Sequence, residues 1–353
     1  MKKSSKIISL LLAVAILISL AVTSHAASDQ VTLNMLCYNV AGLPSIGGVM
    51  GIQGADVPGN QKAIGSQLNG SKYDIIAVQE DFGYHKNLAS ELTAYPYQTI
   101  HSGNIPGGDG LNVFSRTPVY NETRTGWEKA FGVVKNGADE LTPKGFLYTV
   151  IDIGNGIYID LYTLHADAGK DEGSIAARND NFRQLAEAIK AKNSDRPTII
   201  TGDFNTSSHL ESGKDFTKYL IDDLGFKDCW TELYNNGNYA DYSEFAEKYG
   251  ENTYRGNWDS IEKFLYKNGG GVTIEPSDFE YIEMYNGEVS ASDHKSASVT
   301  MTFTKTADFK ENTETLTVAK KNPLKAFLHK IKVIFADLTK LLSHVGDVFG
   351  LLK

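Results

Sequence analysis

The stretch Thr201-Gly202-Asp203-Phe204-Asn205 decides the class of fold, because it closes the short apolar run 197–200. An apolar run of this length bounded by a glycine and polar residues is typical of a buried strand. Asp203 and Asn205 are two residues apart, so on an extended strand end their side chains point the same way. In open α/β folds, ligands bind where strands end. We therefore expect a strand that delivers two polar side chains to a ligand site.

Polar side chains recur at the ends of other predicted strands. The positions are Glu80 at the end of 74–80, Asn39 in 31–40, His165 after 157–164, and Ser292-Asp293-His294 before 298–303. Carboxylates, amides and imidazoles at one edge of a sheet suit a divalent metal ion with oxygen ligands. Such an ion can assist the hydrolysis of a phosphate ester.

Residues 1–27 have the pattern of a secretory signal peptide. Lysines at 2, 3 and 6 precede the apolar run 7–22, and Ser24-His25-Ala26 is a small-residue cleavage pattern. We therefore expect a secreted protein; a retained amino-terminal anchor is the alternative. With 353 residues, of which 41% are hydrophobic, the chain can hold one large or two ordinary domains with a sizeable core.

Strand and helix patterns alternate through residues 28–304, which we expect to form one domain. Gly154-Asn155-Gly156 is a hairpin signal between two strands. Hairpins mixed with βα units favour stacked mixed sheets over a purely parallel doubly wound sheet. The expected fold class is α/β (α+β), a four-layer sandwich of two stacked mixed β-sheets flanked by helices, plus a C-terminal amphipathic helix. Expected strands are 31–40, 74–80, 111–116, 146–153, 157–164, 197–202, 261–266, 279–284 and 297–303, and expected helices are 60–69, 84–92, 174–192, 213–224 and 241–249.

The chain changes character after residue 304. Residues 305–322 are polar and rich in threonine, which predicts a linker. Residues 323–353 carry an apolar stripe at helical spacing with lysines opposite it, and no apolar run long enough to cross a bilayer. This basic amphipathic helix has three readings: it docks on the main domain, pairs in a coiled coil, or lies on an anionic membrane surface. Its broad apolar face favours peripheral membrane contact.

Charge and cysteine content narrow the classes of partner. The net charge is −9, and the main domain is more acidic still because lysines gather in the leader and the tail. Long-range attraction to a polyanion such as nucleic acid is therefore disfavoured. Cys37 and Cys229, the second in the strand-like stretch 226–230, could form a disulfide, but two small buried hydrophobic residues are the favoured reading.

Five short motifs occur in an informative order: Tyr-Asn-Val at 38–40, Val-Gln-Glu-Asp at 78–81, Leu-His-Ala-Asp-Ala-Gly at 164–169, Thr-Gly-Asp-Phe-Asn at 201–205 and Ser-Asp-His at 292–294. Over residues 31–304 the chain resembles the endonuclease/exonuclease/phosphatase superfamily. That resemblance implies a deoxyribonuclease-I-like fold. The superfamily also contains neutral sphingomyelinases and inositol-phosphate phosphatases.

The resemblance assigns roles to several residues. It implies that Glu80 is the principal metal ligand with Asn39 beside it, and that His165 contacts the phosphate. Glu262 stands where an aspartate partner of His294 is expected, so the extra methylene changes the geometry of that pair. Asp293 is expected to bind or steer the metal. The implied cofactor is Mg²⁺, or another divalent cation such as Mn²⁺ or Ca²⁺.

General chemistry supports this assignment. A lone carboxylate at Glu80, ending a buried strand, is costly unless a cation neutralises it. His294 is a proton-transfer group because the pKa of histidine lies near neutrality. Asn205 and His165 would hold phosphoryl oxygens, while Asp203 and His294 share water activation, with the base left open between them. The implied reaction is in-line attack of water on phosphorus.

The substrate class is the least determined property. An aromatic segment, 230–258, is either ordinary packing or a rim for a choline headgroup, a lipid surface or bases. With the acidic domain and the basic tail, it favours a phospholipid phosphodiester of the sphingomyelinase or phospholipase C type. A secreted deoxyribonuclease-like endonuclease and a non-catalytic membrane-surface binding relative are the alternatives. His85, His101 and His209 match no motif and are read as surface residues; the oligomeric state is unknown.

Overall fold

The computed structural model describes residues 29–44, 54–105, 107–132, 139–207, 216–243, 247 and 261–318. The predicted signal peptide (1–27) and amphipathic helix (323–353) lie outside these ranges and remain predictions. Within the described ranges, no helix has the length and apolar character needed to cross a membrane.

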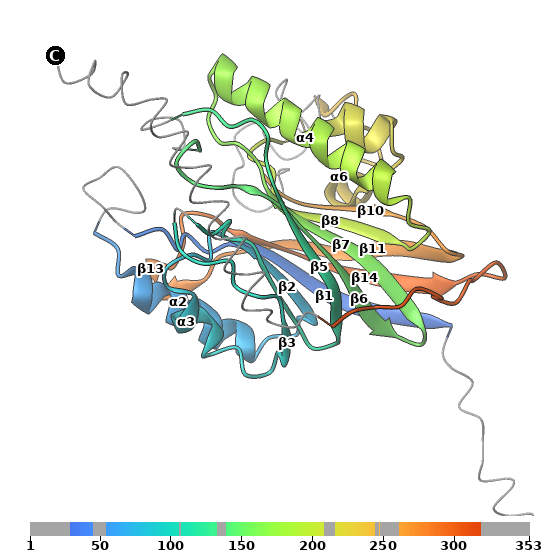
Figure 1. The fold of residues 1–353 in the computed structure, drawn as a ribbon, viewed down its shortest axis with the longest axis horizontal. Coiled ribbons are helices and arrows are strands. Elements are labelled where there is room, and N and C mark those ends of the chain that lie inside the picture. The colour runs from blue at the N-terminus through green and yellow to red at the C-terminus, as the bar shows by residue number, and fades with distance from the viewer. Residues whose placement is uncertain are drawn as a thin grey trace, which may run out of the picture.

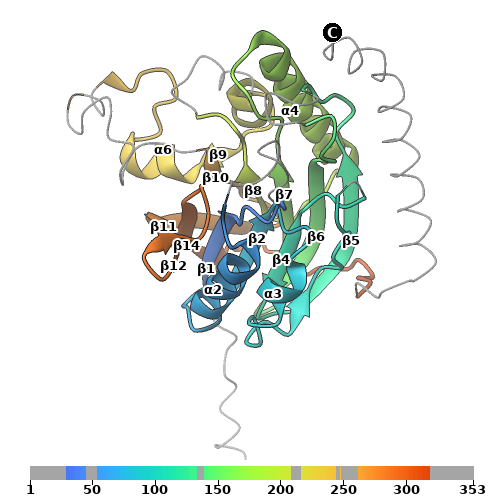
Figure 2. The same cartoon turned by 90° about the vertical axis from the view of Figure 1, so that its left-hand side faces the viewer.

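Two mixed six-stranded sheets lie face to face in the described part of the chain (Figures 1 and 2). The strands are β1 (Gln30–Asn39), β2 (Ile75–Gln79), β3 (Tyr97–Gln98), β4 (Asn112–Ser115), β5 (Val119–Gly126), β6 (Gly145–Gly154), β7 (Ile157–His165), β8 (Thr198–Asp203), β9 (Lys227–Asp228), β10 (Glu262–Lys267), β11 (Val272–Ile282), β12 (Tyr285–Asn286), β13 (Val289–Ser290) and β14 (Ser296–Lys305). The order is β11-β14-β1-β2-β4-β3 in the first sheet and β5-β6-β7-β8-β10-β9 in the second, and β12 and β13 form a separate hairpin. Each large sheet has one central parallel pair, β1 with β2 and β7 with β8.

Helices cover the outer face of each sheet. α2 (Val57–Asn69) and α3 (His85–Ala89) pack on the first sheet, whereas α4 (Glu172–Lys192) and the π-helical turn η3 (Thr217–Asp222) pack on the second (Figure 2). The short α6 (Cys229–Tyr234) closes the side of the core between the sheets. The predicted four-layer sandwich is confirmed.

The alternation of side chains along β1 explains why the layers form. Leu33, Met35 and Cys37 face the second sheet, while Leu36 and Tyr38 face the helices, as a strand buried on both faces requires. Both cysteines of the chain are buried free thiols, as the favoured reading predicted.

Several predicted boundaries are wrong for local reasons. The strand-like stretch 226–230 is strand only at Lys227–Asp228, because the Asp228 side chain accepts a hydrogen bond from the Trp230 amide and starts α6. Trp230 is buried and its ring stacks on that of Tyr242. This part of the aromatic segment 230–258 therefore packs in the domain and does not form a rim for a substrate. The strand predicted at 279–284 begins earlier, as β11. The helix predicted at 213–224 is helical at 217–222 among the described residues, and most of 241–249 lies outside them.

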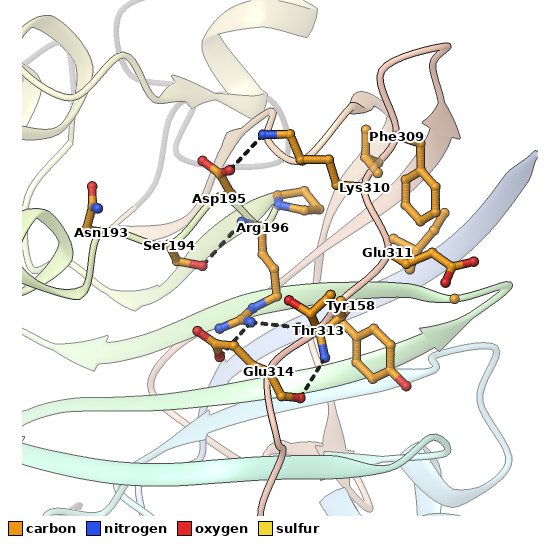
Figure 3. Close-up of a pocket in the computed structure, with 16 residues that line it drawn as sticks. Tyr158, Asn193, Ser194, Asp195, Arg196, Phe309, Lys310, Glu311, Thr313 and Glu314 are labelled. Carbon is orange, nitrogen blue, oxygen red and sulfur yellow. Dashed lines mark hydrogen bonds and ion pairs between the residues drawn. The ribbon is translucent and has the colours of Figure 1, made fainter.

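The polar segment after β14 is held against the domain as far as Val318. Phe309 packs on the core between the sheets, and Leu316 packs on the core beneath α4. The Arg196 guanidinium donates to the Glu314 carboxylate at 2.9 Å, beside a pocket of about 340 Å³ (Figure 3). Residues 306–318, which fall in the predicted linker 305–322, therefore contact the body of the domain.

We expect a chain that ends after Lys305 to be less stable than one that ends after Val318. The shorter chain loses the packing of Phe309 and Leu316 and the ion pair of Arg196 with Glu314, together worth about 2–4 kcal/mol, and keeps the ion pair of Arg196 with Asp160. Urea unfolding curves of the two chains measure the difference. Coincident curves would mean that these contacts contribute nothing to folding.

Candidate active site

The ends of the central strands meet at one end of the sandwich. β1 and β2 are parallel, and so are β7 and β8, so the carboxyl end of each strand lies beside that of its neighbour. His165 and Glu262 both lie opposite Asp203 in the sheet register. The structure thereby brings together Asn39 and Glu80 from the first sheet, His165, Asp203 and Glu262 from the second, and His294 from the loop before β14.

Asn39 joins the two sheets at this site. Its side-chain amide nitrogen lies 3.0 Å from a Glu80 carboxylate oxygen and 3.0 Å from an Asp203 carboxylate oxygen, and donates to both. The same nitrogen lies 3.4 Å from His294 Nε2. Its oxygen accepts from the Ala41 amide, which fixes the orientation of the side chain. Asn39 is buried, so these contacts hold the two carboxylates in a defined position.

Glu80 is presented by a strained turn. Its φ is +58°, in the left-handed region that residues other than glycine rarely adopt. Burial raises the pKa of the Glu80 carboxyl, and the hydrogen bond from Asn39 only partly opposes this effect. A carboxylate held in this way gains stability from a nearby cation. The buried Glu80 carboxylate therefore fits a hard divalent ion, which prefers oxygen ligands.

Asp203 contacts the two residues that the sequence assigns to the phosphoryl oxygens, His165 and Asn205. One carboxylate oxygen lies 3.3 Å from His165 Nε2, and the other accepts from the Asn205 amide at 2.9 Å. The Asn205 side chain donates to the Ala166 carbonyl, which lies in the loop after His165. Burial raises the pKa of Asp203 and lowers that of His165 well below its usual range. His165 is therefore a neutral imidazole. It lies beside the Asp203 carboxylate, whose raised pKa favours accepting a proton.

Glu262 contacts His294 although it is one methylene longer than the aspartate expected at this position. His294 Nδ1 lies 2.5 Å from a Glu262 carboxylate oxygen, so glutamate reaches the imidazole fully. Burial alone would lower the pKa of His294, but the hydrogen bond to Glu262 and the charge of Asp203 outweigh burial and raise it to about 10. The His294 imidazole is consequently protonated on both ring nitrogens and positively charged at neutral pH.

The loop that carries His294 is tied to β1. The Ser292 hydroxyl donates to the Asn39 carbonyl at 2.7 Å and accepts from the His294 amide. Asp293 is exposed at the rim, where its charge acts on the pKa of both Glu80 and His294. Every residue assigned from the sequence therefore lies in or beside this site.

Lys144 belongs to the same region and was not singled out from the sequence. Its buried ammonium forms an ion pair with Asp139 and lies 3.4 Å from the Ala166 carbonyl. Burial alone would lower the pKa of Lys144, but Asp139 outweighs burial and raises it. The charge acts on Glu80, His165 and Asp203. The available signal was a lysine directly before the buried strand 146–153.

We expect Asp167, two residues after His165, to make stability depend on pH. Burial and the charge of Asp139 raise its pKa from an ordinary value near 4 to about 8. Between these values the folded chain keeps a proton that the unfolded chain releases, so stability falls as pH rises. Between pH 4 and pH 8, the free energy of unfolding should therefore fall less in the Asp167→Asn variant than in the wild type. Urea unfolding curves of both proteins at both pH values measure this difference. Equal losses would contradict the raised pKa.

Two mixed sheets whose strand ends share carboxylates, an amide and two histidines define a protein of the deoxyribonuclease-I-like class. The model of the Endonuclease/Exonuclease/phosphatase family matches residues 36–294, and the chain belongs to this family. Within this site, Asp203, Glu262 and His294 together could hold a metal ion, since one ligand atom of each lies within 4.8 Å of those of the other two.

Several known proteins are similar to the chain in sequence or in fold. The chain is 27% identical over 278 residues to sphingomyelinases of Mycobacterium bovis and Mycobacterium tuberculosis, covering 75% of this chain and 52% of theirs. The chain thus spans about half the length of these curated relatives. D. rerio TDP2 complexed with a single-strand DNA product is similar in fold, with a TM-score of 0.56 and 16% identity over 76% of this chain and 98% of that one. Beta toxin from Staphylococcus aureus has a TM-score of 0.52 and 18% identity over 76% and 99%.

Proposed function

We propose that the chain is a secreted, divalent-metal-dependent phosphodiesterase that hydrolyses its substrate by in-line attack of water. The observation that carries this proposal is the amide of Asn39 bridging Glu80 and Asp203, since it joins an acid suited to a cation with an acid suited to water activation. Family membership supports the same reaction class.

The residues divide into holding and proton-transfer groups. Glu80, with Asp293 at the rim, would hold the cation, which when bound supplies positive charge for the phosphoryl oxygens; carboxylate ligands suit Mg²⁺, with Mn²⁺ or Ca²⁺ as alternatives. Asn39 would join them as a ligand only by turning its side-chain oxygen from the Ala41 amide toward the cation. Asn205 and the neutral His165 both contact Asp203 and would donate hydrogen bonds to non-bridging oxygens.

Asp203 and His294 divide the proton transfer. The raised pKa of Asp203 makes its carboxylate the better proton acceptor, so it would orient and deprotonate the attacking water. His294 carries a proton at neutral pH and would donate it to the leaving oxygen, with Glu262 stabilising the imidazolium. Proton donor and acceptor are thereby distinct residues.

A phospholipid, cleaved as a sphingomyelinase or phospholipase C would cleave it, is the substrate class that we favour. Tyr285 and Val289 are 46% and 68% exposed on the β12–β13 hairpin. His294 follows five residues after Val289, so it lies within about 18 Å of this exposed side chain. The similarity to sphingomyelinases supports the same choice. Peripheral membrane contact through residues 323–353 is part of the proposal. Deoxyribonuclease-like endonuclease activity is the second candidate, favoured by the fold that the chain shares with TDP2.

To test this proposal, the mature protein is incubated with Mg²⁺ and each of four substrates, and hydrolysis is measured. The substrates are sphingomyelin, phosphatidylcholine, plasmid DNA and inositol phosphates. We expect cleavage of a choline phospholipid at a rate well above that of plasmid DNA, and cleavage about 10²–10⁴-fold slower by a His294→Ala control. Cleavage of DNA alone would replace the lipid assignment with the nuclease assignment. No cleavage of any of the four would indicate the non-catalytic alternative.

A further inference from the structure

A second cluster of metal-ligating side chains lies directly beside Glu80. Asp81 follows β2, His85 begins α3, and His101 follows β3, and one ligand atom of each lies within 4.8 Å of those of the other two. Reading His85 and His101 as surface residues was wrong, because both are partly buried; His209 lies outside the described residues. The site described above uses none of these three side chains.

The Asp81 carboxylate is incompletely satisfied. One oxygen, Oδ2, lies 2.7 Å from His85 Nδ1 and accepts from the Asn112 amide at 2.9 Å. The other oxygen, Oδ1, is buried and has no hydrogen-bond partner among the described residues, and the whole of Asp81 is only 1% exposed. Leaving a carboxylate oxygen buried without a partner is costly, and a bound cation removes that cost.

The donor set selects a type of ion. Two imidazole nitrogens with one carboxylate suit zinc and similar transition ions, whereas Mg²⁺ and Ca²⁺ prefer oxygen ligands alone. His101 Nε2 lies 3.1 Å from the Asp81 backbone carbonyl, the type of contact that fixes the tautomer of a ligating histidine. We propose that Asp81, His85 and His101 form a second metal site, for a divalent transition ion such as Zn²⁺.

Binding requires a defined rearrangement. The rings of His85 and His101 are stacked, with centroids 4.1 Å apart and planes 7° from parallel. The lone pair of an imidazole nitrogen lies in the plane of its ring, so two parallel rings cannot both aim at one ion. One ring must turn out of the stack when the ion binds. Asp81 is also the residue after the strained Glu80, so an ion here would fix the strand end that presents Glu80.

Zinc stoichiometry tests this site. Untagged, chelator-cleared protein in excess Mg²⁺ is titrated with Zn²⁺ by calorimetry. The wild type and Glu80→Gln should each bind one equivalent more than His85→Gln/His101→Gln. Lys86→Ala, an exposed neighbour on α3, is the matched control and should bind as the wild type does. A folded double variant that binds as many equivalents as the wild type would overturn the proposal.

Co²⁺ provides a readout that does not depend on folding of the double variant. Bound Co²⁺ should give visible absorption typical of nitrogen ligands in the wild type, and His101→Gln alone should change that spectrum. Spectra that are identical in the two proteins would exclude His101 as a ligand. Because these measurements record binding and not hydrolysis, their outcome is independent of the proposed phosphodiesterase activity.

Discussion

Replacing His294 with alanine should lower turnover by about 10²–10⁴-fold, the usual contribution of a general acid. The variant loses the protonated imidazole that Glu262 holds at 2.5 Å. Asp203→Asn should cause a loss of similar size, because it removes the proton acceptor. Turnover at saturating substrate and Mg²⁺ is the measurement. Lys295→Ala, in the same loop, is the control and should retain activity.

Glu262→Gln should cost less than His294→Ala. The glutamine oxygen can still accept from His294 Nδ1, so the orientation of the ring survives while the charge is lost. A loss as large as that of His294→Ala would show that the charge of Glu262, and not only its position, is required. A nearly silent His294→Ala would mean that the proton donor has been assigned to the wrong residue.

Replacing Glu80 with glutamine should lower activity by about 10²–10⁴-fold while stabilising the metal-free fold. The loss of activity follows from removal of the charge that would hold the cation, worth several kcal/mol or about 10²–10⁴-fold in rate. The gain in stability follows from the raised pKa of Glu80, since burial disfavours its charged form. In excess chelator at neutral pH, the thermal midpoint of Glu80→Gln should therefore exceed that of the wild type.

The exposed Glu275→Gln is a matched control for both readouts. It should leave the rate and the midpoint unchanged, because Glu275 lies on β11 away from the site. A Glu80→Gln variant with a lower midpoint than the wild type would show that Glu80 stabilises the fold without metal, contrary to the direction of its pKa.

The fold was predictable where apolar residues mark buried strands. β2, β7, β8 and the second half of β1 are mostly buried on both faces, and they are the strands whose ends form the site. β5 was missed because its sequence, VYNETRTG, is mostly polar and only partly buried, so no apolar pattern marks it. The ordering of residues 306–318 was also missed, since its contacts come from single residues such as Phe309 and Arg196.

The site was predictable where a motif ends a strand, and less so elsewhere. Asn39, Glu80, Asp203 and His294 all come from strand ends or the loop beside one. Lys144, by contrast, becomes part of the site only through its buried ion pair with Asp139, a contact that spacing in the sequence does not reveal. The stack of His85 on His101 likewise depends on tertiary packing.

The most direct test of the central claim is phosphodiester hydrolysis by chelator-treated protein before and after Mg²⁺ is restored. We predict no hydrolysis by the wild type in excess chelator, full recovery on addition of Mg²⁺, and no recovery by Glu80→Gln under the same conditions. Full hydrolysis by the wild type in excess chelator would contradict a metal-dependent reaction centred on Glu80.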